Sequence, residues 1–90
     1  MTPHQRKLAR HALGLPNSRR KSYRNHFVAS EGHDDFQCWM AMRSAGFAKH
    51  RKGNSITGGD DVFWLTLAGA LAALEPRESL DLDDFPEASA

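Results

Sequence analysis

Apolar side chains near the N-terminus recur at helical spacing. Thr2 and Gln5 have the spacing of a capping box, and Gly14 is a typical residue for ending a helix. Between them, four apolar residues share one face of a helical wheel, opposite a face of basic side chains: Leu8, Ala9, Ala12 and Leu13. This pattern predicts an amphipathic surface helix over residues 3–13 that docks on the rest of the chain.

A second helix is predicted over residues 34–45. Asp34 and Gln37 repeat the capping-box spacing, and Gly46 stands where a left-handed glycine commonly follows a helix, with Phe47 available for the accompanying apolar contact. Four residues fall on one stripe at spacings of three and four: Phe36, Trp39, Met40 and Arg43. The outward side then holds Asp35, Gln37, Cys38 and Met42.

Two strands and a third helix are predicted next. FAKHRK and VFWLT, separated by the turn-rich GNSITGGDD, have the pattern of a β-hairpin with a long tip. Thr66 is expected to cap a helix that Pro76 ends. Because strand alternation directs Phe63 and Trp64 to opposite faces, one of them is expected inside. The predicted core is Trp39, Met40, Phe47, Phe63 or Trp64, Leu67, Leu71 and Leu74.

These elements predict a small α+β domain with three helices and a two-stranded β-hairpin. Residues 1–75 are expected to form a single globular domain, which suits a chain of 90 residues. Residues 76–90 are interpreted as an acidic flexible tail, dispensable for folding, because Glu75 and the residues after it include six acids, two prolines and three large apolar side chains. Cys38 is the only cysteine, so an internal disulfide is excluded.

Charge is distributed unevenly along the chain. The net charge of +1 combines +8 over residues 1–52 with −7 over residues 53–90. The first thirty residues contain seven basic side chains and no acid. Such a distribution favours a basic surface that binds a polyanion, together with an acidic C-terminal segment. The longest apolar stretch, residues 62–74, is too short to span a bilayer, so we expect a cytoplasmic protein without membrane contact.

Part of the chain resembles a known family. A helix ending in A-G-F, a basic strand, a glycine-rich tip, a second strand and the helix-opening L-T-L-A-G-A-L are similar to the wing and C-terminal helix of winged-helix DNA-binding domains. This resemblance covers residues 36–74 and implies a winged-helix-like fold that binds DNA. The chain departs from the family in the helix that would enter the major groove, residues 34–45, where Arg43 is the only cation.

A second resemblance concerns origin. TPHQRKLARHALGL, KSYRNHF and GGDDVFWLT, in that order within residues 2–74, resemble small proteins of tailed phages and prophages. This resemblance implies a viral protein that acts in the cytoplasm of a host cell, and it implies no mechanism.

Candidate binding residues fall in two basic groups with aromatic side chains nearby. Their cations would contact phosphates and make binding depend on salt. The first group is a loop and the second a strand of the hairpin: Arg19, Arg20, Lys21 and Arg24, and Lys49, Arg51 and Lys52. Tyr23 and His26 lie beside the loop group and would stack on unpaired bases. The alternative is that Tyr23 and Phe27 anchor the core while the arginines only keep a loop soluble.

Catalytic and metal-binding patterns are weak. Asn25-His26 and the run from His33 to Asp35 superficially resemble pieces of HNH-type nucleases or a metal site, yet the chain has no HxH, HxxxH or HExxH pair. Cys38 has no basic neighbour in sequence to activate it. Asp60 and Asp61 belong to a GGDD turn without the lysine of a phosphate loop and are interpreted as solubilising the hairpin. We therefore expect no enzyme, no cofactor and no metal.

Two functions follow from these patterns. The first is a phage-derived nucleic-acid-binding protein, regulatory in role, that uses the basic loop and the basic hairpin strand. The second is a phage-encoded inhibitor that docks on a host or defence complex by protein–protein interaction, as an anti-CRISPR protein does. The sequence leaves the choice of partner, the sequence preference and the oligomeric state open, a dimer included.

Overall fold

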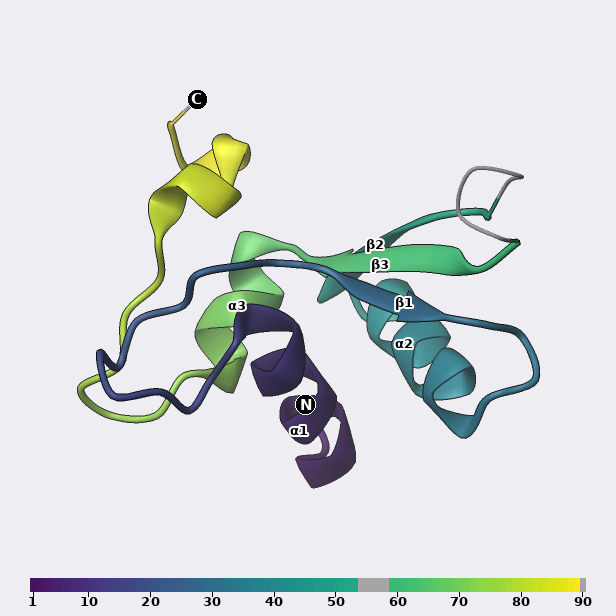
Figure 1. The fold of residues 1–90 in the computed structure, drawn as a ribbon, viewed down its shortest axis with the longest axis horizontal. Helices are drawn as coiled ribbons and strands as arrows, with labels where there is room; N and C mark the ends of the chain where they lie inside the picture. The colour runs from purple at the N-terminus through teal and green to yellow at the C-terminus, as the bar shows by residue number, and fades with distance from the viewer. Residues whose placement is uncertain (54–58, 90) are drawn as a thin grey trace.

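The computed structural model describes residues 1–53 and 59–89 (Figure 1). Its elements, in chain order, are α1 (Pro3–Leu13), β1 (Phe27–Ala29), α2 (Asp34–Ser44), β2 (Ala48–Arg51), β3 (Asp61–Leu65), α3 (Leu67–Ala73) and two 3-10 turns, η1 (Leu82–Asp84) and η2 (Pro86–Ser89). The predicted α+β class and the three α-helices are confirmed. Among these described helices, none has the length and apolar character that a membrane crossing requires.

The described sheet has three strands, so the prediction of two is wrong. All pairs are antiparallel, in the order β1-β3-β2. β2 and β3 form the predicted hairpin, whereas β1 pairs with the other edge of β3, with Phe27 opposite Phe63. A three-residue strand is too short to show a period of two in the sequence, and its partner is distant along the chain. Residues 54–58 of the predicted tip lie outside the described residues.

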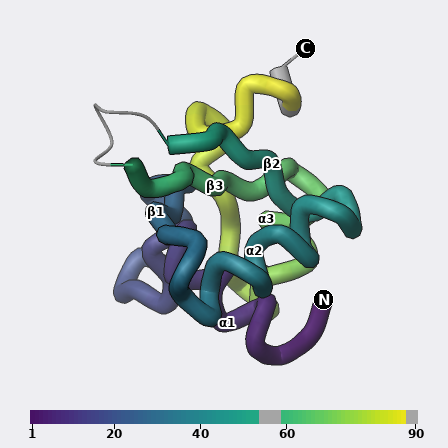
Figure 2. The backbone as a smooth tube through the Cα atoms, turned by 90° about the vertical axis from the view of Figure 1, so that its right-hand side faces the viewer, coloured from purple at the N-terminus to yellow at the C-terminus, as the bar shows by residue number. Residues whose placement is uncertain are grey.

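The helices cover one face of the sheet. Figure 1 shows α1 and α2 on one side of the strands and the C-terminal turns on the other, and Figure 2 shows the same layers from the side. Phe63 faces the helices and is fully buried, and Trp39 of α2 stacks on it with ring centroids 5.6 Å apart. Trp64 is only partly buried and faces the other way. Phe63 is therefore the core member of the pair.

α1 begins and ends as its sequence predicts. The Thr2 hydroxyl accepts a hydrogen bond from the Gln5 amide at 3.1 Å, and the Gln5 side chain accepts one from the Thr2 amide at 3.0 Å. Gly14 follows the helix with φ +79°. A positive φ favours glycine, and here a Cβ would also lie 2.2 Å from the Tyr23 ring. The apolar face is buried as expected.

The ends of α2 are partly as predicted, and its buried face differs from the prediction at Met42. His33 is the N-cap residue and makes no side-chain cap, so Asp34 lies in the first turn, where its charge suits the helix dipole. Gly46 has the expected left-handed conformation. The buried residues are Phe36, Trp39 and Met42, because this set points to the sheet. Met42 is fully buried, so the prediction that it faces outward is wrong. Met40 is half-buried and packs against the core, whereas Arg43 is exposed.

The fully buried residues of α3 are small, while Leu67 at its start and Leu74 at its end are partly buried and pack against the core as predicted. Thr66 caps it as predicted, accepting a hydrogen bond from the Gly69 amide at 3.1 Å. Gly69, Ala70 and Ala73 are its buried residues, which lets the helix approach its neighbours closely. Leu71, predicted to lie in the core, is 55% exposed. The spacing of the leucines is typical of a buried face. In the structure the backbone of α3 approaches Phe47 closely at Gly69, so small residues occupy its most buried positions.

The C-terminal segment packs on the domain, which differs from the prediction of a loosely attached tail. Phe85 is 1% exposed and belongs to the core cluster, and Leu80 packs against that cluster. Glu78 pairs with Arg10 of α1, and the Glu87 carboxylate accepts a hydrogen bond from the Leu67 amide at 2.5 Å. Composition could not reveal these contacts because each joins the segment to residues far along the chain.

Candidate functional site

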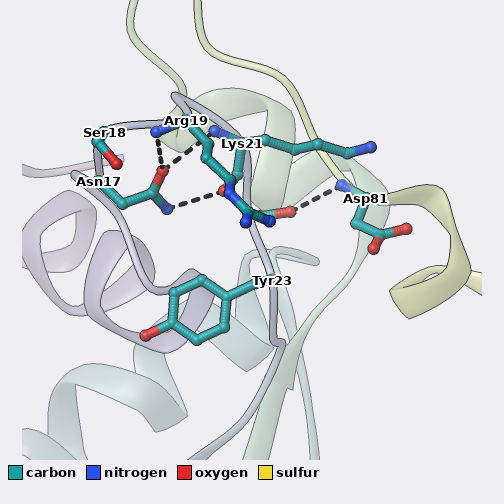
Figure 3. Close-up of a pocket in the computed structure, with 7 residues that line it drawn as sticks. Asn17, Ser18, Arg19, Lys21, Tyr23 and Asp81 are labelled. Atoms are coloured by element: carbon teal, nitrogen blue, oxygen red, sulfur yellow. Dashed lines mark hydrogen bonds between the residues drawn. The ribbon is translucent and has the colours of Figure 1, made fainter.

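The basic loop is shaped by Asn17. Its Oδ1 accepts hydrogen bonds from the amides of Arg19 at 3.0 Å and Lys21 at 3.5 Å. Its Nδ2 donates to the carbonyls of Gly14 at 3.0 Å and Lys21 at 2.8 Å. Figure 3 shows the hydrogen bonds of Asn17 with Arg19 and Lys21, around which the loop folds. One uncharged side chain therefore holds the backbone of the cationic residues, a role that sequence reasoning did not assign to it.

The loop and the C-terminal segment together form a pocket of about 360 Å³. Its lining combines cations, an aromatic ring and one acid: Asn17, Ser18, Arg19, Lys21, Ser22, Tyr23 and Asp81. In Figure 3 the Arg19 side chain lies between Tyr23 and Lys21. The Ser22 hydroxyl accepts a hydrogen bond from the Asp81 amide at 2.9 Å, and Lys21 forms a parallel bridge with Ser79. These contacts fix the segment beside the loop.

Tyr23 is an exposed ring and not a core anchor. It is 61% exposed, and its ring lies over Gly14. The guanidinium carbon of Arg24 lies 5.3 Å from the ring centroid, within the range of a cation–π contact. Arg24 also donates to the carbonyl of His11 at 2.7 Å, near the end of α1. Arg24 is thus partly used for structure, whereas the Tyr23 ring remains accessible.

The second basic group lies on β2 and just after it. Lys49, Arg51 and Lys52 are all exposed. Between them His50 turns inward and stacks on Phe63, with ring centroids 4.6 Å apart. The alternation of the strand therefore separates an outward cationic row from an inward histidine.

The two basic groups do not line a common pocket. Lys49 belongs to a smaller pocket of about 190 Å³ that also includes Asp84 and Phe85, whereas Arg19 and Lys21 line the loop pocket with Asp81. The C-terminal segment contributes acids to both pockets, Asp81 to the first and Asp84 and Glu87 to the second. The predicted site is therefore two cationic patches, each beside acids of the C-terminal segment.

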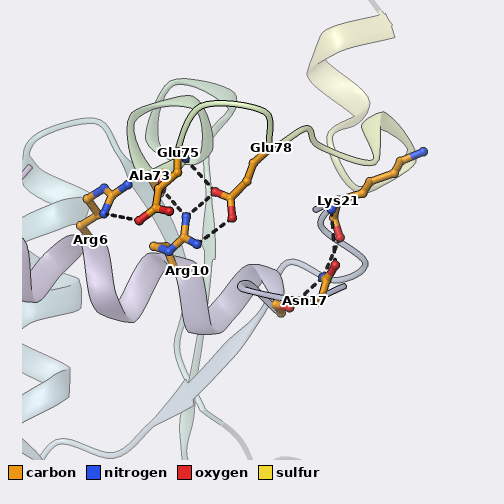
Figure 4. A network of polar contacts seen from close by, with 8 residues as sticks. Arg6, Arg10, Asn17, Lys21, Ala73, Glu75 and Glu78 are labelled. Carbon is orange, nitrogen blue, oxygen red and sulfur yellow. Dashed lines mark hydrogen bonds and ion pairs between the residues drawn. The ribbon is translucent and has the colours of Figure 1, made fainter. Parts of the chain in front are cut away.

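Among the described residues, the ion pairs involve other cations. Arg6 lies 3.5 Å from Glu75, and Arg10 forms a paired contact with Glu78 (Figure 4). Burial opposes the Glu78 charge, but hydrogen bonds from Arg10 outweigh it and lower the pKa of Glu78 to about 2. Within the described part of the chain, no ion pair is formed by any of these predicted site residues: Arg19, Arg20, Lys21, Arg24, Lys49, Arg51 and Lys52. Their charge remains available to a partner.

Asp61 does not solubilise the hairpin as predicted. It is buried, its carboxylate pairs with His50, and it accepts a hydrogen bond from the Gly53 amide at 2.7 Å. The hydrogen bond from His50 is the main cause of the lowered pKa of Asp61. One feature of the sequence points to this pair. His50 and Asp61 both occupy inward positions of the hairpin strands, and antiparallel pairing brings such positions close together.

The residues considered for catalysis either make structural contacts or lack the surroundings that would activate them. The Asn25 side chain donates to the Leu65 carbonyl at 3.0 Å and accepts from its amide at 2.8 Å, extending the pairing of β3. Burial and the nearby Asp35 charge raise the pKa of Cys38, which disfavours the thiolate. Residues 1–53 and 59–89 contain no group of three metal-ligating side chains placed to hold an ion.

Comparison with known proteins adds no family to this description. No family model, curated protein or solved structure matches the chain.

Proposed function

We propose that this protein binds nucleic acid through its two cationic patches, the loop patch (Arg19, Arg20, Lys21, Arg24 with Tyr23) and the strand patch (Lys49, Arg51, Lys52). The observation that supports this proposal best is a difference in ion pairing between the cations of α1 and those of the two patches. Arg6 and Arg10 are neutralised by glutamates, whereas the patch cations form no ion pair within the described residues. Cations left exposed and unpaired are the groups that replace counterions on a phosphate backbone.

The loop patch has the chemistry of phosphate and base contact in one place. Arg19 and Lys21 line the same pocket as the exposed Tyr23 ring. Cations beside an exposed aromatic ring suit a nucleotide, whose phosphate and base require these two kinds of contact. The acid in this pocket, Asp81, belongs to the C-terminal segment.

The order of the helices and strands also supports this proposal, because it resembles that of a winged-helix DNA-binding domain. Helix α2, the β2–β3 hairpin and the Thr66-capped α3 follow one another as in a winged-helix domain, and we propose that the domain is winged-helix-like. However, α2 begins with Asp34 and Asp35 and has Arg43 as its only cation. Contact with nucleic acid is therefore assigned to the loop and the strand, in the cytoplasm of a host cell, and not to α2.

The test is binding of a labelled oligonucleotide at about 50 and 200 mM salt, where phosphate contacts weaken measurably. R19Q/K21Q, which removes the two cations that line the loop pocket, is expected to bind more weakly and to lose roughly 0.9 units of salt slope for each phosphate contact removed. K7Q/R43Q is the matched control, because Lys7 and Arg43 are exposed cations outside the patches. Equal affinity of the two variants, with unchanged circular dichroism, would exclude the loop patch.

A second candidate is an inhibitor that docks on a host protein complex. The observation that favours it is a set of exposed apolar side chains outside the cationic patches: Val28, Leu71 and Leu82. Docking on a partner protein would remove their apolar surface from water, which is favourable. No oligonucleotide binding at the lower salt concentration would favour this second function.

A further inference from the structure

The sheet has an outer face that the helices leave uncovered. Strand alternation places Val62 and Trp64 of β3 on this face, since Phe63 and Leu65 are buried on the helix side. Across the sheet, Lys49 is the register partner of Trp64 and Arg51 the partner of Val62. The outer face therefore presents an aromatic ring and an aliphatic side chain in one strand, with a cation beside each in the next.

These outward side chains do not belong to the core. Val62 and Trp64 are partly buried, yet neither is among the residues that pack on the core cluster. Val28, the partner of Val62 in β1, is 51% exposed. The C-terminal turns border the face, where Trp64 and Lys49 line a pocket with Phe85. Figure 1 shows these turns on the side of the sheet away from α2.

On β2 and β3 the charged side chains of opposite sign lie on opposite faces of the sheet. The only carboxylate of β2 and β3 is Asp61, which is buried on the inner face and paired with His50. The cations Lys49 and Arg51 are exposed and form no ion pair within the described residues. The strands therefore present cations around an aromatic ring on the outer face, while Asp84 and Glu87 of the C-terminal turns border the pocket beside Trp64.

We infer that this outer face binds single-stranded nucleic acid, with an unpaired base stacked on Trp64 and phosphates contacting Lys49 and Arg51. The inference rests on the proposed function and narrows its substrate to unpaired strands. Stacking on an aromatic side chain requires an open base face, which a duplex does not offer because its bases already stack on one another. A cationic surface alone would accept either form, so Trp64 is the residue that discriminates between them.

The experiment measures the fluorescence of Trp64 itself. The chain has two tryptophans, and W39F leaves Trp64 as the only one. This substitution keeps an aromatic ring on Phe63 and removes an indole N–H that has no hydrogen-bond partner among the described residues. W39F is titrated with an oligothymidylate and, separately, with a duplex containing the same number of phosphates. We expect the single strand to quench Trp64 fluorescence and to bind more tightly than the duplex.

A second variant keeps the test independent of how W39F folds. In the otherwise unchanged chain, W64A is expected to lose roughly tenfold in affinity for the oligothymidylate, a typical effect of removing one stacking ring, with little change for the duplex. L71A, which truncates an exposed apolar side chain on α3 outside this face, is the control and is expected to retain the affinity.

The outcomes separate the inference from the proposed function. Salt-dependent binding of both forms with equal affinity and no fluorescence change would overturn the inference and leave the proposed function standing. No binding of either form at low salt would overturn both. If W64A shifts the protein from dimer to monomer in light scattering without altering affinity, the face joins two copies of the chain and the inference is wrong.

Discussion

Arg10 and Glu78, 68 positions apart, form a two-point ion pair: Nη1 lies 2.5 Å from Oε1 and Nη2 lies 2.7 Å from Oε2. Both side chains are nearly buried. Arg10 Nη1 also donates to the Ala73 carbonyl at 3.0 Å, so one guanidinium joins α1, α3 and the C-terminal segment (Figure 4). This contact explains why a segment with an acidic, proline-containing sequence lies against the domain.

Replacing Glu78 with glutamine is expected to destabilise the protein by about 1–3 kcal/mol at neutral pH, because a charged hydrogen-bonded pair is broken. The folded-state pKa of about 2 lies below the ordinary 4.5. The stabilisation is therefore complete above about pH 4.5 and is lost as pH falls toward 2. Urea unfolding of wild type and E78Q between pH 7 and 2 measures the difference. A difference that stays constant across this range would contradict the assignment.

Truncating Phe85 to alanine is expected to cost about 3–5 kcal/mol, since a fully buried aromatic side chain leaves a cavity. By the same reasoning, deletion of residues 77–90 should lower the melting temperature, contrary to the expectation of a dispensable tail. The exposed Leu82 is the matched control, and L82A should change stability by less than about 1 kcal/mol. A wild-type melting curve for F85A would show that the segment is detached in solution.

Two substitutions in α3 distinguish its leucines from its small residues. A Cβ on Gly69 would lie 2.0 Å from the Phe47 carbonyl oxygen, so G69A should destabilise the protein by more than about 1 kcal/mol. L71A should cost less than about 1 kcal/mol because Leu71 is mostly exposed. Thermal unfolding of both variants checks the order. If L71A were destabilised more than G69A, the leucines and not the small residues would form the buried face of α3.

Neutralising Asp84 is expected to raise stability. Burial, followed by the charges of Asp81 and Asp83, raises the pKa of Asp84. A carboxyl group with a raised pKa disfavours the folded state once it is ionised, so D84N should raise the melting temperature at neutral pH. The gain should shrink as pH falls and the wild-type carboxyl group becomes protonated. E31Q, which removes an exposed acid elsewhere, is the control.

The same substitution should also tighten nucleic-acid binding, because Asp84 lines a pocket with Lys49 and competes with phosphate there. D81N should act likewise at the loop patch, where Asp81 faces the pocket of Arg19 and Lys21. The affinity gain is expected at low salt and should fade as salt screens the charges. Weaker binding by either variant would mean that the acid itself contacts the partner.

The candidate site was only partly accessible to sequence reasoning. The density of cations in residues 19–24 and 49–52 was visible, and so was Tyr23 among them. The role of Asn17 in shaping the loop was not, because its partners are backbone groups whose positions depend on the fold. The placement of Asp81 and Asp84 beside the two patches depended likewise on how the C-terminal segment packs.

The sequence by itself determined the local features of this protein. The Thr2 and Thr66 caps, the left-handed glycines after α1 and α2, and the β2–β3 hairpin depend on residues a few positions apart, and local propensity and hydrogen bonding suffice to specify them. Tertiary structure decided which leucines are buried, the third strand, and the place of the C-terminal segment. Each of these follows from contacts between distant residues, such as Phe27 with Phe63 or Arg10 with Glu78, and periodicity along the chain contains no information about such partners.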